Sequence, residues 1–272
     1  MTTTPNGRED AAALDLLRAE LRRTNFAGRP VTLGEGILAA AACAILAGQS
    51  RSRLDGPVIA AIGLLGLADD LLEPRQRAAG SAPAKGLRGH LGALRRGRLT
   101  TGAAKAIGIP ALALVAAAGA PGRGGPTGIL VDAALCAGAA NLANLLDLRP
   151  GRALKALIPA ATAIRLLPIS ARDDDRAASA RALALAAALP GIAALPADLR
   201  EHGMLGDCGA NALGSAAGIA LARSAPLPVR VLVLAGVTGL TLASERISFS
   251  RVIDSTPLLR AVDSWGRRRG DA

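Results

Sequence analysis

Apolar residues are concentrated in eight runs along the chain, separated by short segments that hold most of the charge. The runs cover 33–48, 57–68, 103–120, 127–146, 154–170, 179–197, 208–222 and 229–243. Runs of this kind are typical of membrane helices, which need about 20 apolar residues to cross a bilayer. The pattern predicts an all-α, polytopic transmembrane helix bundle of about eight spans, whose shorter members rely on tilt or local thinning of the bilayer.

The same pattern divides the chain into three regions. We expect an N-terminal cytoplasmic segment, a transmembrane domain that contains one long cytoplasmic loop, and a basic cytoplasmic tail, at 1–32, 33–243 (loop 71–102) and 244–272. Within the first region, Leu14, Leu17 and Leu21 recur at helical spacing. This spacing predicts a short amphipathic helix over 11–23, on the inner membrane surface or on a partner.

Composition alone leaves an alternative to the membrane bundle. Hydrophobic residues make up 51% of the chain, but many are Ala, which is near neutral on membrane-insertion scales. A soluble, Ala-rich helical domain is therefore the competing interpretation. The net charge of +11 also raises the question of nucleic-acid binding, so the placement of the charge matters more than its size.

The positive charge is distributed to one side of the expected bundle. If the N-terminus is inside, the inner segments carry 21 of the 32 Lys and Arg residues and the outer segments carry 6. This is the positive-inside bias of membrane proteins, and it predicts that both termini are cytoplasmic. We therefore expect a multi-pass protein of the cytoplasmic membrane with no nucleic-acid partner. Cys43, Cys136 and Cys208 are scattered in or beside apolar runs, which favours packing over a disulfide or zinc site.

With the topology derived from Lys and Arg alone, the acidic motifs also lie on the inner side. Asp69 and Asp70 end the second apolar run, Asp147 ends the fourth and Asp207 opens the seventh. Adjacent carboxylates in an apolar helix repel each other and lose hydration, so a compensating cation is expected. Mg²⁺ suits them because it takes carboxylate oxygens together with substrate phosphates.

Each acid has an ordinary structural interpretation as well. Asp69 and Asp70 would be a solvated helix end, Asp147 a loop acid, and Asp207 a helix cap beside Gly206. The combination is more specific, because the loop on the same side is rich in basic residues: Lys85, Arg88, His90, Arg95, Arg96 and Arg98. Acids for a metal and bases for phosphates are the requirements of a phosphoryl-transfer site.

In this order, the motifs resemble those of the polyprenyl-phosphate N-acetylhexosamine-1-phosphate transferases, which include the phospho-N-acetylmuramoyl-pentapeptide transferase and the UDP-GlcNAc:undecaprenyl-phosphate GlcNAc-1-phosphate transferase. The matching segments cover most of the chain. They are Gly34-Glu35-Gly36, the Asp-Asp motif in Gly66–Asp70, Lys85-Gly86-Leu87, the NxxNxxD pattern in Asn141–Asp147, and the GDxGAxxLG pattern in Gly206–Gly214.

The resemblance implies transfer of a sugar-1-phosphate from a UDP-amino sugar to polyprenyl phosphate, with release of UMP, for a bacterial envelope polymer. Asp207 would hold Mg²⁺ with Asp69, and Asp69, Asp70 and Asp147 would be the catalytic acids. Asn144 would bind the nucleotide. Lys85, His90 and Lys105 would neutralise substrate phosphates.

The sequence also departs from this family. Leu148 stands where the family has Gly, Pro150 stands at a second aspartate, and the pattern is that of a ten-helix bundle without its first and last helices. A catalytically inactive member that serves as a lipid-phosphate-binding or scaffold subunit is therefore an alternative. The shortened bundle leaves a seam that a second copy or an envelope assembly partner would cover. A small transporter is a third interpretation, but it predicts polar groups at helix midpoints, which most of the runs lack.

Overall fold

The computed structural model describes residues 5–78, 100–122, 124–166 and 174–268, and within them the chain forms eleven helices and one two-stranded sheet. This confirms the all-α class. All eight apolar runs form helices, which begin and end within a few residues of the expected limits except at the end of α3. They are α2 (Gly34–Ala47), α3 (Asp55–Ala78), α5 (Thr101–Ala118), α6 (Pro126–Leu146), α7 (Arg152–Leu166), α8 (Asp174–Leu199), α9 (Gly206–Ser224) and α10 (Leu227–Ser244).

The expected number of membrane spans is wrong. Within the described residues, four helices are long and apolar enough to cross a membrane, namely α5, α6, α8 and α10. Helix α2 has 14 residues, or about 21 Å at about 1.5 Å per residue, which is short of a hydrocarbon core of about 30 Å. Helix α7 is similarly short, α3 carries several charges, and α9 is rich in Gly, Ala and Ser.

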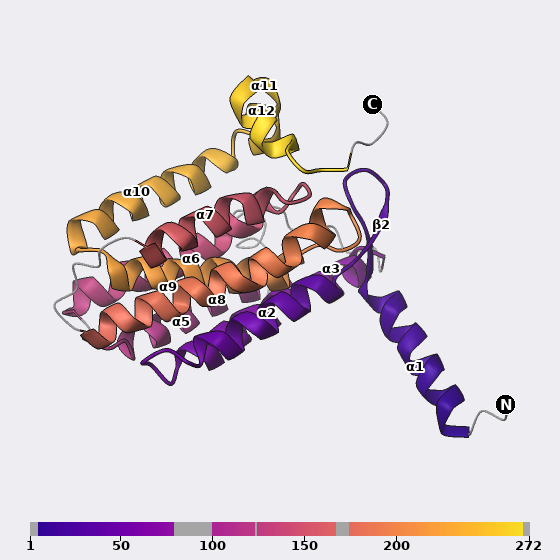
Figure 1. Cartoon of the computed structure of the whole chain (residues 1–272), viewed down its shortest axis with the longest axis horizontal. Coiled ribbons are helices and arrows are strands. Elements are labelled where there is room, and N and C mark those ends of the chain that lie inside the picture. Colours follow the sequence, from indigo (N-terminus) through magenta and orange to yellow (C-terminus); the bar gives the residue numbers. More distant parts are fainter. Residues whose placement is uncertain (1–4, 79–99, 123, 167–173, 269–272) are drawn as a thin grey trace.

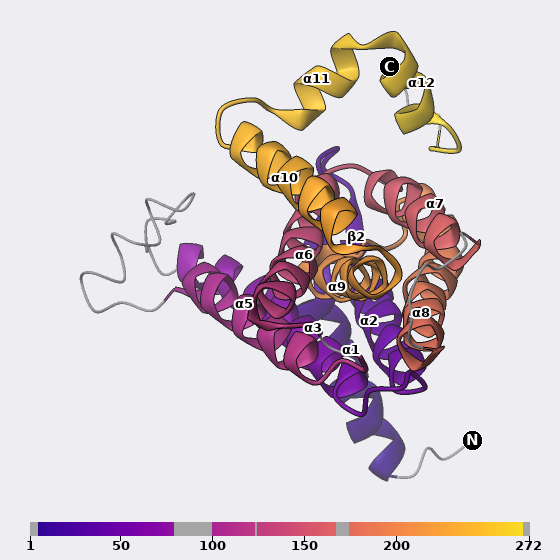
Figure 2. The same cartoon turned by 90° about the vertical axis from the view of Figure 1, so that its left-hand side faces the viewer.

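Helix α9 lies at the centre of the bundle. Figure 2 shows it nearly end-on, surrounded by α2, α3, α6, α7 and α8, and it packs most extensively on α6. Gly214 and Gly218 make this approach close, because a Cβ at either position would lie 2.7 Å from a backbone oxygen of α6. Two glycines four residues apart share one helix face, and such a pair lets two helix backbones come together.

Helix α10 lies at the edge of the bundle against α6, and none of its residues is buried. Its apolar side chains include Val229, Leu232, Leu240 and Leu242, all substantially exposed. A helix that is apolar and has no buried residue would expose a large apolar surface to water, which is unfavourable. It is the part of the molecule whose surface is most typical of a helix in contact with lipid.

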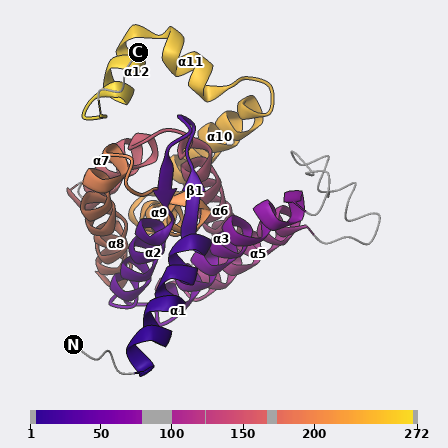
Figure 3. The ribbon, with the colours of Figure 1, turned by 90° about the vertical axis from the view of Figure 1, so that its right-hand side faces the viewer.

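The N-terminal region projects from one end of the bundle (Figures 1 and 3). Helix α1 (Pro5–Leu21) is followed by β1 (Arg22–Thr24), which pairs antiparallel with β2 (Pro30–Thr32). Thr32 also forms a parallel bridge with Gly203, so the hairpin is tied to the turn that precedes α9. The predicted helix over 11–23 forms as part of α1 as far as Leu21, whereas Arg22 and Arg23 lie in β1. Its Leu14 and Leu17 are more than half exposed.

The C-terminal tail folds back onto the same end of the bundle. It forms two short helices, α11 (Phe249–Ser255) and α12 (Pro257–Ser264). The Arg152 guanidinium donates to both carboxylate oxygens of Asp263, at 2.8 and 3.0 Å. The backbone N–H of Arg268 donates to Leu199 O. The tail is therefore held to the start of α7 and to the end of α8.

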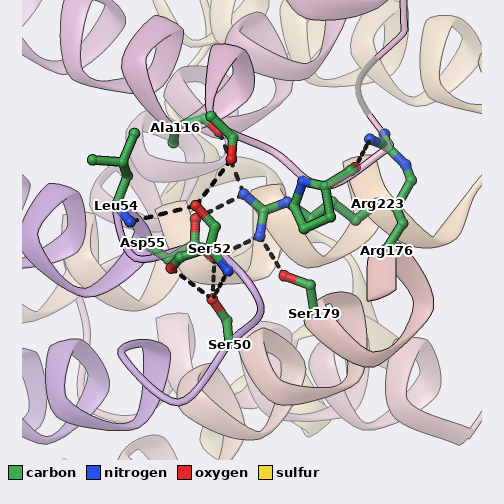
Figure 4. Close-up of polar contacts among 10 residues, drawn as sticks. Ser50, Ser52, Leu54, Asp55, Ala116, Arg176, Ser179 and Arg223 are labelled. Atoms are coloured by element: carbon green, nitrogen blue, oxygen red, sulfur yellow. Dashed lines mark hydrogen bonds and ion pairs between the residues drawn. The ribbon is translucent and has the colours of Figure 1, made fainter. Parts of the chain in front are cut away.

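The opposite end of the bundle is closed by buried ion pairs (Figure 4). The Arg223 guanidinium donates to both oxygens of Asp55, at 2.5 and 2.7 Å, and to Ser179 Oγ. Both charged side chains are almost fully buried. The charge pattern places these residues in outer loops, but Asp55 begins α3 and Arg223 lies in the last turn of α9. The pair joins the ends of α3, α8 and α9.

Candidate functional site

The start of α9, the second half of α3 and the start of α5 meet at the end of the bundle that carries the N-terminal hairpin. Two glycines make this junction possible. Gly66 faces the backbone of Asp207, where a Cβ would lie 2.8 Å from Cys208 N. Gly206 adopts a φ of 58°, a conformation that L side chains rarely take, and a Cβ there would lie 2.9 Å from an Asp70 carboxylate oxygen.

Asp70 caps α9 from a different helix. Its carboxylate accepts hydrogen bonds from the backbone N–H groups of Asp207 at 3.2 Å and Cys208 at 3.0 Å. These N–H groups belong to the first turn of α9, where they have no partner within the helix and where a negative charge is favourable. Arg23 of the hairpin donates to Asp70 O at 2.6 Å. Asp70, which the sequence predicts as a catalytic acid, therefore uses its carboxylate to hold the first turn of α9 in position.

Lys105 lies between two of the predicted acids. Its ammonium group pairs with the carboxylates of Asp69 and Asp207, which come from α3 and α9. The side chains of Lys105, Asp69 and Asp207 are 15%, 10% and 22% exposed, so the cluster is shielded and still open to solvent on one side. A lysine between two carboxylates compensates the charge repulsion that the sequence predicted for this region.

Asp147 lies behind this cluster, at the C-cap of α6. Burial raises the pKa of the Asp147 carboxyl well above its usual range, and the charges of Asp198 and Asp207 raise the same pKa further. A backbone hydrogen bond with Gly206 acts in the opposite direction on this pKa. Asp147 Oδ2 is buried without a hydrogen-bond partner among the described residues. Its buried position near Asp207 therefore favours the protonated form of the Asp147 carboxyl.

Of the remaining predicted site residues, one lies in a described helix and two do not. Asn144 is half-buried in the last turn of α6, one turn before Asp147. Lys85 and His90 lie outside the described residues. The prediction of a loop from residue 71 is wrong at its start, because α3 continues to Ala78 and includes Pro74. Asp69 and Asp70 therefore lie within a helix rather than at its end.

Two acids near the site were not predicted as site residues. Both carboxylate oxygens of Glu35 are buried without a partner among the residues that the structure describes, and Gly203 lies directly against this side chain. Asp198 is buried in α8 and accepts from Gly151 N at 3.1 Å. The signal for Glu35 is present in the sequence, since an acid between two glycines opens an apolar run, whereas nothing local distinguishes Asp198.

The carboxylates of the cluster suit Mg²⁺ if a substrate phosphate supplies further oxygen ligands. Mg²⁺ is commonly held by one or two carboxylates plus substrate phosphates, and Asp69 and Asp207 supply carboxylates on adjoining helices. In the described parts of the chain, no group of three or more His, Cys, Asp or Glu side chains is placed to hold a metal ion. The arrangement therefore suits a cation shared with a substrate phosphate, and it does not suit a cage made by protein ligands alone.

Comparison with known proteins adds no identification: no protein-family model, no curated protein and no solved structure matches the chain. The fold and the cluster define a helical bundle with four helices able to cross a membrane and a lysine-bridged acidic site at one end.

Proposed function

We propose that the chain transfers a sugar-1-phosphate, most consistently an N-acetylhexosamine-1-phosphate, from a UDP-sugar to polyprenyl phosphate at a membrane surface. The observation that carries the proposal is the convergence of Asp69 and Asp207 on Lys105. These residues come from three helices, and Asp69 and Asp207 lie in motifs that resemble those of the transferase family. In the reaction, a phosphate oxygen of the lipid forms a bond to the sugar-bearing phosphorus, and the bond from that phosphorus to UMP breaks.

The chain's own residues supply positioning and charge. Lys105 pairs with both acids, and its ammonium would turn from them to an incoming phosphate oxygen, since phosphoryl transfer depends on neutralising the charge of the transferred group. Asp70 keeps the first turn of α9 in place through two backbone hydrogen bonds. Asp147 would lie on the nucleotide side together with Asn144, and its raised pKa favours the protonated carboxyl, which can donate a hydrogen bond.

Asp207 and Asp69 are the residues that would hold Mg²⁺ in this proposal. When bound, Mg²⁺ would supply charge neutralisation for the phosphates and would orient them. The carboxylates are partly exposed, so a cation and a phosphate can reach them from one side. Lys105 and the cation would then share the negative charge of the acids and the substrate.

A second function is favoured by the same contact. Because Lys105 already pairs with both acids, it offsets one of their two negative charges without a metal ion, as it would in an inactive member that binds lipid phosphate or serves as a scaffold. Leu148 and Pro150, at positions where the family has other residues, agree with this alternative.

The two functions differ in UMP release. We expect the purified protein in detergent, supplied with polyprenyl phosphate, Mg²⁺ and a panel of UDP-amino sugars, to release UMP with at least one donor. Asp207→Asn should abolish release. Asp174→Asn is the matched control, because Asp174 is an exposed acid in the first turn of α8, at the other end of the bundle. No release from any donor, with lipid and Mg²⁺ saturating, would reject the enzyme and support the scaffold.

A further inference from the structure

Helix α12 carries a stripe of apolar side chains that the rest of the described chain does not cover. Leu258 and Trp265 are each 74% exposed, and Val262 is 53% exposed. The three residues are separated by four and three positions, so they lie on one face of the helix. The stripe continues into Trp265, the residue that caps α12.

The position of α12 is set by a buried charge on another face. Asp263 is 7% exposed and receives both hydrogen bonds from the Arg152 guanidinium. Lys155 Nζ donates to Asp263 O at 2.6 Å, and Arg267 Nε donates to Pro150 O at 3.0 Å. These contacts attach α12 to the start of α7 and leave its apolar stripe directed away from the bundle.

The surroundings of α12 indicate what meets the stripe. In the chain, the tail follows α10, the apolar helix with no buried residue, and Figure 2 shows α11 and α12 outside the ring of helices, with α11 leading from the end of α10 and α12 above α7. The tail therefore emerges from a helix able to cross a membrane, at the end of the bundle where that helix ends.

The charge of the tail points to the same environment. Residues 245–268 contain five Arg and three acidic residues, and one of these acids, Asp263, is already paired within the protein. Arg260 is exposed on the face of α12 opposite the stripe, and Arg268 is exposed just after the helix. An amphipathic helix with an apolar face, a Trp and flanking Arg side chains is the pattern of a segment that lies in the plane of an anionic membrane surface.

We propose that α12 and Trp265 insert into the headgroup region of the membrane leaflet at the end of the bundle where α10 ends, and that anionic lipids bind this segment. The proposal rests on the bundle spanning a membrane, but not on the transferase activity. The Asp263–Arg152 pair connects this anchor to the turn after Asp147, so the tail ties the candidate site to the lipid surface.

Trp265 is the only tryptophan in the chain, so its fluorescence reports on this segment alone. The full chain would be reconstituted into vesicles of phosphatidylcholine and phosphatidylglycerol, with and without lipids brominated near the headgroup end of the acyl chains. We expect blue-shifted emission and loss of about half of the intensity with brominated lipid, which is the depth of an interfacial helix. Aqueous iodide should quench weakly.

Two variants separate insertion from a general effect of charge. Val262→Glu places an acid in the apolar stripe and should remove most of the quenching by brominated lipid. Ser264→Glu places the same acid at an exposed polar position on the same helix, away from the stripe, and should retain most of it.

Three results would overturn the proposal. In the first, the protein floats with vesicles but Trp265 is quenched by iodide and not by brominated lipid. In the second, the emission is blue-shifted and neither quencher reaches Trp265, which means that a second copy covers the stripe. In the third, the protein does not float with vesicles, so the membrane premise itself fails. Loss of UMP release with quenching intact would affect only the transferase proposal.

Discussion

Arg223 and Asp55 bring two opposite charges into the interior of the bundle, with 1% and 0% of their side chains exposed. Removing one member of such a pair leaves an uncompensated buried charge, whereas replacing both with apolar residues is often tolerated. We expect Arg223→Met to lower the free energy of unfolding by about 3–5 kcal/mol. The double variant Arg223→Met with Asp55→Leu should recover most of this loss. Unfolding in detergent measures both, and equal losses for the single and double variants would contradict a role as a charge pair.

Asp147 gives a prediction with a definite pH dependence. Its pKa is raised in the folded chain, so the native state holds this proton more tightly than the unfolded state does. Stability from this group is therefore present below the ordinary pKa of 3.8 and is lost as the pH rises through the raised folded pKa. Asp147→Asn, which resembles the protonated acid, should stabilise the protein at pH 8 by about 1 kcal/mol or more.

At pH 4 the same variant should have little effect on the unfolding temperature, because Asp147 is then protonated in the folded protein. Asp174→Asn, at an exposed position, serves as the control at both pH values. A stabilisation by Asp147→Asn that is equal at pH 4 and pH 8 would show that the carboxyl does not titrate as its burial requires. A gain of stability with a loss of UMP release would be expected of an acid kept for function at a cost in stability.

At the scale of the element, the contact between α6 and α9 depends on two glycines. Because a Cβ at Gly214 or Gly218 would meet backbone atoms of α6 at 2.7 Å, the helices must separate to admit a larger side chain. Gly218→Leu should lower the stability by at least about 1–3 kcal/mol, the usual cost of overpacking. Gly236→Leu is the matched control in α10, where an added Cβ meets no atom within 4 Å. Equal unfolding temperatures for the two variants would contradict the packing account.

The elements themselves were largely predictable, and their membrane role was less so. Each apolar run forms a helix, because a continuous apolar pattern is a local signal. Whether a helix crosses a membrane depends on its final length and on where its charged side chains point. Neither property can be read from the apolar runs. Helix α3 shows this, since it continues past Asp69 and Asp70 to Ala78 where the sequence predicts a loop.

The sequence predicts which residues gather at the candidate site better than it predicts the contacts between them. Ordered motifs and the distribution of positive charge predict that Asp69, Asp70 and Asp207 lie on one side of the bundle. No local pattern indicated that Lys105 pairs with two of these acids, or that Asp70 caps α9, because such contacts join residues more than 30 positions apart. For the same reason, the charge pattern predicts an outer loop for Arg223, whereas Arg223 lies in α9 and pairs with Asp55.

At the scale of the whole molecule, the two ends of the bundle should lie on opposite sides of a membrane. The three native cysteines are buried and can be replaced by Ala, so that single cysteines can be introduced at the exposed positions Asp15 and Asp174. In intact cells, a membrane-impermeant thiol reagent should label Asp174→Cys and spare Asp15→Cys until the membrane is opened. Labelling of both in intact cells, or of neither, would contradict the N-in topology.

The most direct test follows the sugar-1-phosphate itself in vesicles whose orientation has been determined. A UDP-sugar does not cross a bilayer, so with donor outside, vesicles that expose the N-terminal end should form the lipid-linked sugar diphosphate, and those of the opposite orientation should form it only after detergent opens them. Asp174→Asn should behave as the native chain, and Asp207→Asn should give no product. Absence of lipid-linked product from every UDP-amino sugar, even in opened vesicles with Mg²⁺ present, would contradict a transfer site at Asp69, Lys105 and Asp207.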